Sequence, residues 1–355
     1  MHKKLFIPGP TEVRKDVLEK LATPMIGHRG SDYSALQGSV VGKIQKALYT
    51  NNKIIMSTSS GTGLMDAAIL NFTKKRVLTT NCGAFSKRWA QNAASYGKEL
   101  DTIEVEWGKH VPTKEIDKYL ATGKYDCLFY THNETSTGVM NPIEELSAVM
   151  KKYPEVIWCV DSVSSMMGAK LEVDKLGVDF ILASTQKAFA LPPGFAIAAV
   201  TEKAIEYAKT VPNRGYYFAI DSFLEYYDRN QTPTTPAIPY LYALDYQLSK
   251  IIDEEGLENR WARHIEMANY VRDWAHEFFA VFAEEGYESL TVTCIDNNRG
   301  VDVSALVKEL GKRGKAMANG YGKLKEKTFR IAHMGDITLD EIKEYLEDIE
   351  DILGL

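Results

Sequence analysis

Residues 156–187 read VIWCVDSVSSMMGAKLEVDKLGVDFILASTQK, and this stretch contains two runs, 156–160 and 180–183, that are apolar at every position. Such runs are typical of strands buried on both faces, as in a parallel sheet covered by helices. Similar short runs occupy positions 54–56, 76–80, 102–105, 127–130 and 195–200, and helix-like segments such as 64–72, 86–96 and 143–152 lie between them. This alternation predicts an α/β fold, with a large domain whose mostly parallel, seven-stranded sheet is sandwiched by helices.

After residue 222 the pattern changes. Residues 231–239 contain three prolines, which excludes a regular helix there. A helical pattern from about 240 to 282, broken near Gly256, is followed by strand patterns at 290–295 and 328–332 and helical patterns at 303–312 and 339–353. The length of 355 residues suggests about two domains. We therefore predict an N-terminal segment (1–15), a large domain (16–240) and a smaller α+β C-terminal domain (241–355).

The composition restricts the class of protein. Hydrophobic residues make up 45% and charged residues 25%, which excludes a mainly disordered chain, and the net charge of −6 does not favour a nucleic-acid partner. The apolar run before the turn at 8–10 is only three residues long (5–7), too short for a secretory signal, and no apolar stretch approaches the ~18 residues of a membrane span. The four cysteines form no C-x-x-C pair, so neither a metal site nor a disulfide framework is predicted. We expect a cytoplasmic protein with reduced thiols and no membrane partner.

The segment 57–63, Ser-Thr-Ser-Ser-Gly-Thr-Gly, follows a predicted strand and opens a predicted helix. Small residues and the free N–H groups of a helix N-terminus favour a bound phosphate. The segment is not a P-loop, because no Gly-Lys-Ser/Thr follows it, and Asp66 stands where a dinucleotide site needs its third glycine. The alternative, a helix start with Ser and Thr as ordinary caps, is equally open at this point.

Two ionisable residues follow the two fully apolar strands. Asp161 needs a cation or several donors at the end of so apolar a strand, unless it is the N-cap of a helix beginning near Ser162. Lys187 is the only charged residue between Asp179 and Glu202, which suggests a buried amine whose neutral form is favoured. A neutral amine forms Schiff bases with carbonyl compounds, whereas the alternative is a surface lysine with its stem on apolar surface. A phosphate cup, a buried acid and such a lysine together match the needs of pyridoxal 5′-phosphate (PLP).

Seven sequence blocks resemble the class V aminotransferases of fold type I, most closely the alanine–glyoxylate / serine–pyruvate aminotransferase group, which includes proteins labelled soluble hydrogenase small subunit. The blocks are PGPT (8–11), MIGHR (25–29), SGTG (60–63), THNETSTG (131–138), VDSVSS (160–165), STQKA (184–188) and FRIA (329–332). The resemblance implies the PLP transferase type I fold and PLP as the cofactor.

The resemblance also implies a role for each matched residue. Lys187 is the expected Schiff-base lysine and proton carrier, and Asp161 the partner of the pyridine nitrogen. The other implied cofactor contacts are Val163 beneath the ring, Phe85 stacked on it, Thr135 at its hydroxyl, Ser60, Gly61, Thr62 and Gln186 at the phosphate, and Thr235 reaching the phosphate of the other subunit.

Substrate contacts follow from the same resemblance. Arg330 is expected to bind the α-carboxylate with its two-pronged fork, with an exposed charge as the alternative. Gly27, His28 and Arg29 are expected at the pocket mouth, where an inward Arg29 gives a second carboxylate a partner and an exposed Arg29 is the alternative.

The implied reaction moves an amino group from alanine, serine or aspartate to glyoxylate or pyruvate by a ping-pong Schiff-base mechanism, in a homodimer with active sites at the interface. One alternative is sulfur removal from cysteine, which requires a nucleophilic cysteine on a mobile loop. Cys82, Cys127, Cys159 and Cys294 all lie in or beside predicted strands, where cysteines usually act as small hydrophobes. A second alternative, prompted by the hydrogenase labels, is a non-catalytic subunit of a larger complex.

Overall fold

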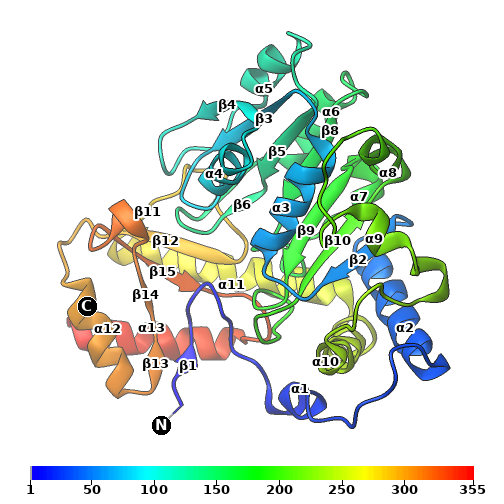
Figure 1. Ribbon diagram of the computed structural model, residues 1–355. Coiled ribbons are helices and arrows are strands. Elements are labelled where there is room, and N and C mark those ends of the chain that lie inside the picture. The colour runs from blue at the N-terminus through cyan, green and yellow to red at the C-terminus, as the bar shows by residue number, and fades with distance from the viewer. Residues whose placement is uncertain (1) are drawn as a thin grey trace.

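A seven-stranded sheet forms the centre of the computed structural model, which describes residues 2–355 (Figure 1). The strand order is β2-β10-β9-β8-β5-β3-β4. The strands are β2 (Lys53–Ser57), β3 (Arg76–Asn81), β4 (Glu99–Glu104), β5 (Cys127–Thr131), β8 (Ile157–Asp161), β9 (Phe180–Ser184) and β10 (Ala196–Val200). Only β10 runs antiparallel to its neighbours, so the predicted mostly parallel sheet is confirmed.

Helices cover both faces of this sheet, because alternate residues of each strand point to opposite sides. In β5, Cys127 and Phe129 pack in one hydrophobic core, and Leu128 and Tyr130 in the other. The first core is covered by α3 (Gly61–Phe72), α4 (Lys87–Ser95) and α8 (Glu202–Lys209), and the second by α2 (Ser31–Ala47), α5 (Thr113–Leu120), α6 (Ile143–Met150), α7 (Val173–Leu176) and α10 (Ile238–Ser249). The sandwich of helices around the sheet is thus as predicted.

A second, antiparallel sheet lies near the C-terminus (Figure 1). Its order is β11 (Ala280–Val281), β12 (Val292–Asp296), β15 (Thr328–Ala332) and β14 (Ala318–Asn319). The helices α11 (Leu257–Phe278), α12 (Val303–Lys312) and α13 (Leu339–Leu353) share a hydrophobic core with it. Two-stranded ladders join β1 (Lys4–Leu5) to β13 (Lys315–Ala316), and β6 (Asn133–Glu134) to β7 (Val139–Met140).

The helical pattern predicted for 240–282 is wrong at its end. Helix α11 ends at Phe278, and Ala280 and Val281 pair with β12 as a strand. Phe279, between them, packs its ring on Trp274 and Phe329, which fixes the turn out of the helix. The predicted break near Gly256 is confirmed, because a π-helix (Lys250–Glu255) and Gly256, with φ of +81°, separate α10 from α11.

Helix α10 packs against α1 (Lys15–Lys20) and α2, in the core of the seven-stranded sheet, before the chain crosses to the second sheet in α11. The remaining short helices are α9 (Ile220–Leu224) and the 3-10 turns Tyr227–Arg229 and Gly322–Leu324. The domain boundaries proposed above stay a prediction.

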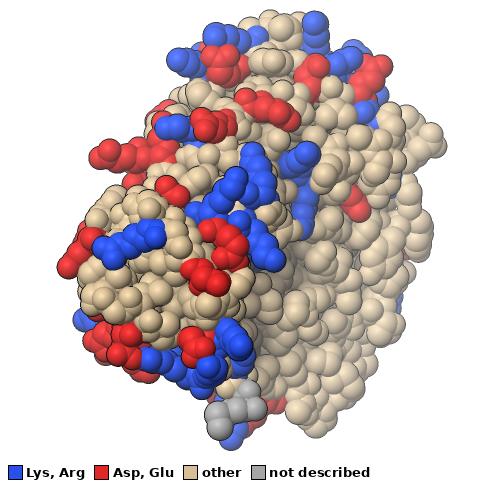
Figure 2. Space-filling model, turned by 90° about the vertical axis from the view of Figure 1, so that its left-hand side faces the viewer, with Lys and Arg blue, Asp and Glu red and all other residues tan. Residues whose placement is uncertain are grey.

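Charged side chains of both signs are spread over the face shown in Figure 2, beside a broad area that carries few. None of the helices in residues 2–355 combines the length and apolar character needed to cross a membrane.

Candidate active site

The ends of β8 and β9 and the start of α3 surround one cavity of about 310 Å³. This is the carboxyl edge of the parallel strands, where ligands bind in open α/β sheets. The residues with predicted cofactor contacts that line the cavity are Ser60, Gly61, Thr62, Phe85, Thr135, Asp161, Val163, Gln186 and Lys187. The structure therefore brings together residues that are up to 127 positions apart in the chain.

Asp161 is the last residue of β8, and only 6% of it is exposed. Its Oδ1 accepts a hydrogen bond of 2.8 Å from the Val163 N–H. A turn follows, so no helix begins near Ser162 and the N-cap alternative is wrong. Burial raises the pKa of the Asp161 carboxyl to about 6. The site thus holds a buried carboxylate that gains stability from any cation placed beside it.

Lys187 lies in the turn after β9 and is 9% exposed, so the surface-lysine alternative is wrong. Its Nζ donates a hydrogen bond to the Pro8 carbonyl. Burial, together with the charge of Arg330, lowers the pKa of the amine to about 8, as desolvation disfavours the charged form. Gly9 passes directly over this amine: its φ is +127°, and a Cβ there would lie 2.6 Å from Nζ. Only glycine fits that crossing.

The start of α3 lies beside two polar groups, on Ser184 and Gln186, that have no hydrogen-bond partner in the described part of the chain, and together they form a cradle. Ser60 is the N-cap residue, but its side chain makes no capping hydrogen bond, so the ordinary-cap alternative is wrong for this residue. Within residues 2–355, Ser184 Oγ and Gln186 Oε1 are buried and have no hydrogen-bond partner. A Cβ on Gly61 would lie 2.8 Å from Val163 Cγ2 and 3.3 Å from Ser184 Oγ. Free helix N–H groups and unpaired polar atoms around a glycine suit a phosphate.

Glu134, which lies in the predicted THNETSTG block without a role of its own, supports the wall that carries Phe85. Its buried carboxylate accepts hydrogen bonds from the Phe85 and Ser86 N–H groups and from Ser136. The Phe85 ring lies 5.1 Å from the Tyr321 ring and 4.6 Å from the Arg88 guanidinium. Arg88 also lines the cavity. Arg88 and Tyr321 were not predicted, because a charge on an amphipathic helix and an aromatic residue in a polar loop give no local signal of a site.

Arg330 lies on β15 and is 7% exposed, so the alternative of an exposed charge is wrong. Its guanidinium donates to the Asn319 carbonyl at 3.1 Å and to the Thr135 carbonyl at 3.4 Å. Thr135 lines the cavity, and its Oγ1 is hydrogen-bonded to Ser164. Arg330 therefore lies at the edge of the cavity, held by the C-terminal sheet.

Gly27, His28, Arg29 and Thr235 do not line this cavity. Arg29 donates to the carbonyls of Thr232 and Pro233 and stacks over the Tyr226 ring at 4.5 Å. Thr235 lines a separate, small pocket. The structure brings the 27–29 and 232–236 segments together, away from Lys187 of the same chain, and their roles at the cofactor and substrate stay predictions.

All four cysteines are buried and free of disulfides. Burial raises the pKa of the Cys82 and Cys294 thiols to about 12. None of the four lines the cavity. The structure thus offers no thiolate of the kind that sulfur removal from cysteine requires.

Comparisons with known proteins agree with this geometry. The family model described as aminotransferase class V matches residues 15–325. An uncharacterized aminotransferase of Methanocaldococcus jannaschii is 38% identical, covering 98% of this chain and 92% of the relative. The L-aspartate–glyoxylate aminotransferase of Paracoccus denitrificans is 32% identical, covering 94% and 87%. Among solved structures, an alanine–glyoxylate aminotransferase from Nostoc sp. has a TM-score of 0.93 at 26% identity, covering 99% and 96%.

Both the type I fold and the predicted resemblance are thereby confirmed. The class V aminotransferases are PLP-dependent transaminases, and the cavity described above lies inside the part of the chain that the family model matches, apart from Gly9, Pro10 and the neighbouring Arg330. This chain belongs to the class V aminotransferase family.

Proposed function

We propose that this protein binds PLP in the cavity beside Lys187 and moves an amino group from a small L-amino acid to glyoxylate or pyruvate. The observation that carries the proposal is that one cavity is lined by a buried lysine, a buried aspartate, and Ser184 and Gln186. Both Ser184 and Gln186 have a buried polar atom without a hydrogen-bond partner among the described residues. An amine, an acid and an anion cradle are the three features that PLP needs from a protein.

The residues present fit the cofactor. Ser60, Gly61, Thr62 and Gln186 would hold its phosphate, Asp161 its pyridine nitrogen and Lys187 its aldehyde, with Val163 and Phe85 against the ring. When bound, PLP supplies an electron sink that makes the Cα–H bond of an amino acid acidic.

Lys187 has the properties of a proton carrier. With a pKa of about 8, about a tenth of the amine is neutral at pH 7 and can accept a proton at Nζ. After Nζ has taken the Cα proton of the substrate, it can donate that proton to another carbon atom within its reach. The Pro8 carbonyl, which accepts a hydrogen bond from Nζ, orients the amine in the cavity.

Asp161 and Arg330 provide fixed charge. At neutral pH a carboxyl with a pKa of about 6 is mostly ionised and can accept a hydrogen bond from a protonated ring nitrogen. Arg330 presents a planar fork of N–H donors that matches an α-carboxylate. Its existing bonds to two backbone carbonyls fix the fork in position.

For the donor we propose alanine, serine or aspartate. The relative named L-aspartate–glyoxylate aminotransferase supports including an acidic donor. Arg29 is the residue we propose for the second carboxylate of aspartate, because two of its N–H groups bind loop carbonyls and the remaining ones are available.

We propose a homodimer in which the 27–29 and 232–236 segments of one subunit complete the cavity of the other. Tyr216, Tyr217 and Met25 support this arrangement, since they are 73%, 51% and 59% exposed in the single chain. Tyr216 and Tyr217 line the same pocket as residues 232–236, and large exposed apolar side chains are typical of a protein interface. A cytoplasmic location is part of the same proposal.

Transfer of labelled nitrogen tests the proposed reaction. Purified protein supplied with PLP, ¹⁵N-alanine and glyoxylate should yield ¹⁵N-glycine and pyruvate, and serine or aspartate should be tested as donors in the same way. Sulfide release from cysteine in place of nitrogen transfer would favour the desulfurase alternative. A protein that binds no PLP and transfers no nitrogen from any donor would favour a non-catalytic subunit.

A further inference from the structure

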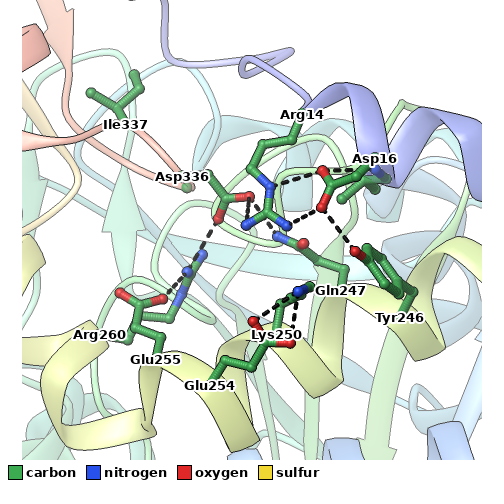
Figure 3. A network of polar contacts seen from close by, with 12 residues as sticks. Arg14, Asp16, Tyr246, Gln247, Lys250, Glu254, Glu255, Arg260, Asp336 and Ile337 are labelled. Atoms are coloured by element: carbon green, nitrogen blue, oxygen red, sulfur yellow. Dashed lines mark hydrogen bonds and ion pairs between the residues drawn. The ribbon is translucent and has the colours of Figure 1, made fainter.

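Arg260, on α11, is completely buried although it lines none of the cavity described above (Figure 3). Its Nε donates to the Met167 carbonyl at 2.9 Å, and its Nη2 donates to the Ala188 carbonyl at 2.5 Å. Its Nη1 contacts Glu255 at 2.8 Å and Asp336 at 3.3 Å. One guanidinium thus joins two backbone carbonyls to two carboxylates.

The two carbonyls belong to the loops that carry the chemistry. Ala188 follows Lys187 directly, and Met167 lies six residues after Asp161, in the loop that follows β8. Each loop contains a non-glycine residue whose backbone lies in the left-handed region. These are Met167, with φ of +68°, and Ala190, with φ of +53°. Such conformations persist only where the surroundings hold them. Arg260 is in contact with both loops.

The N-terminal segment also holds the turn at Lys187, through Thr11. The Thr11 N–H donates to the Gln186 carbonyl at 3.0 Å, and Thr11 Oγ1 donates to the Lys187 carbonyl at 2.9 Å. With the bond from Arg260 to Ala188, each of the three consecutive carbonyls in this turn accepts a hydrogen bond. The backbone that carries the Lys187 amine is therefore held by two separate segments, the N-terminal segment at Thr11 and α11 at Arg260.

Stability alone does not explain an arginine at this position. Burying a guanidinium carries a large desolvation cost, and an apolar side chain of similar size often gives equal or greater stability. What an apolar residue cannot do is reach two carbonyls on separate loops at fixed angles. The planar fork of arginine can, and it differs in this from the single ammonium group of lysine.

We propose that Arg260 is a positioning residue, which sets the backbone of the Lys187 turn and of the Asp161–Met167 loop so that the amine and the carboxylate keep their places across the cavity. For its effect on catalysis the inference rests on the proposed function. For its effect on the two loops it does not.

Asp336 extends the contact to other parts of the chain. This carboxylate also accepts a hydrogen bond of 2.9 Å from Gln247 and lies 3.8 Å from Arg14, which in turn pairs with Asp16 (Figure 3). Arg14 follows the segment that crosses Lys187 at Gly9. The loop after β15 and the N-terminal segment are thus joined to the Lys187 turn through Arg260.

Arg263 is a matched control, because it lies one turn further along α11 and pairs with the same Glu255 at 2.7 Å. It donates to the carbonyls of Gly335 and Ile337 and has no hydrogen bond to Met167 or Ala188. Arg260→Met and Arg263→Met therefore remove the same charge from the same network, and only the first removes hydrogen bonds made directly to the two loops.

Amide hydrogen exchange of the purified full chain, with and without PLP, tests the proposal. Arg260→Met should speed exchange in peptides covering 162–170 and 185–194 by about ten-fold or more, because charge-assisted hydrogen bonds are lost there. Arg263→Met should change it by less than about two-fold. Equal exchange in these peptides for the two variants would overturn the proposal. Should Arg260→Met not fold, Arg260→Lys keeps the charge but cannot span both carbonyls, and faster exchange in the same two peptides is expected; unchanged exchange would again overturn it.

Kinetics of the holoenzyme give a second readout. In Arg260→Met the Lys187 amine should be displaced, so kcat should fall while KM for alanine stays within about two-fold. The isotope effect with α-deuterated alanine should rise. Arg263→Met should leave the isotope effect unchanged. Should the protein transfer no nitrogen at all, the proposed function fails, yet the exchange experiment still decides the role of Arg260.

Discussion

Lys187 and Asp161 line the same cavity without forming an ion pair, and the amine donates instead to the Pro8 carbonyl. Burial lowers the pKa of the amine to about 8 and raises the pKa of the carboxyl to about 6. Two opposite charges left unpaired in a buried site are costly unless a third group lies between them. A cationic ring with an aldehyde fits that description, so this pair supports PLP as the group bound between them.

The lowered pKa of Lys187 predicts a pH-dependent gain in stability for Lys187→Met in protein freed of PLP. Below pH 8 the wild type must bury a charged amine, at a cost of about 3 kcal/mol for a pKa that falls from 10.5 to about 8. Above pH 10.5 the amine is neutral in both states and the cost disappears. Urea unfolding should therefore show the variant more stable below pH 8, with the difference shrinking from pH 8 to 10.5.

Asp161→Asn should also gain stability in the same cofactor-free protein, but its gain should grow with rising pH instead of shrinking. A carboxyl whose pKa is raised from 3.8 to about 6 destabilises the native state progressively between these two pH values, so the variant should gain nothing below pH 3.8 and about 3 kcal/mol above pH 6. A gain that is constant with pH in either variant would contradict the burial of these two charges.

Gly61→Ala should weaken PLP binding. The added methyl group would lie 2.8 Å from Val163 Cγ2, which displaces either the ring support or the start of α3. We expect the dissociation constant to rise by roughly ten-fold or more, as measured by fluorescence titration. Gly42→Ala, in α2, is the control, because its methyl group meets no atom within 4 Å. Equal affinity in both variants would place the phosphate elsewhere.

Arg330→Lys should lower kcat/KM by roughly 10- to 100-fold for every amino donor, because one ammonium group cannot reproduce a bidentate contact with a carboxylate. The loss should be the same for alanine, serine and aspartate, which share the α-carboxylate. Steady-state kinetics with the three donors measures this. A loss confined to aspartate would instead assign Arg330 to the second carboxylate.

Arg29→Ala should change the choice of donor. Because Arg29 also holds the Thr232 and Pro233 carbonyls, turnover of all donors should fall by a common factor. On top of that, kcat/KM for aspartate relative to alanine should drop about ten-fold if the guanidinium meets a second carboxylate. An unchanged ratio would remove Arg29 from substrate binding and leave it as support for the 232–236 segment.

The sequence was sufficient for the buried strands of the main sheet, which appear as short apolar runs, but not for the bounds of the edge strand β4. There the sequence indicates 102–105 and the strand is Glu99–Glu104, because most of its side chains are not buried. The sequence also failed at 280–282, where the apolar run 278–282 continues the pattern of α11, and only pairing with β12 turns it into a strand. The cofactor cavity could be predicted from the residues that directly follow the strands. Glu134 and Arg260 could not be identified in this way, since their roles depend on backbone groups that are distant in sequence.

Reduction of the holoenzyme with borohydride, followed by peptide mapping, identifies the lysine to which PLP is linked. We predict one phosphopyridoxyl group per chain, on the peptide that contains Lys187, and none in Lys187→Ala. A label on another lysine, or no label on protein saturated with PLP, would show that Lys187 is not the residue that binds the cofactor.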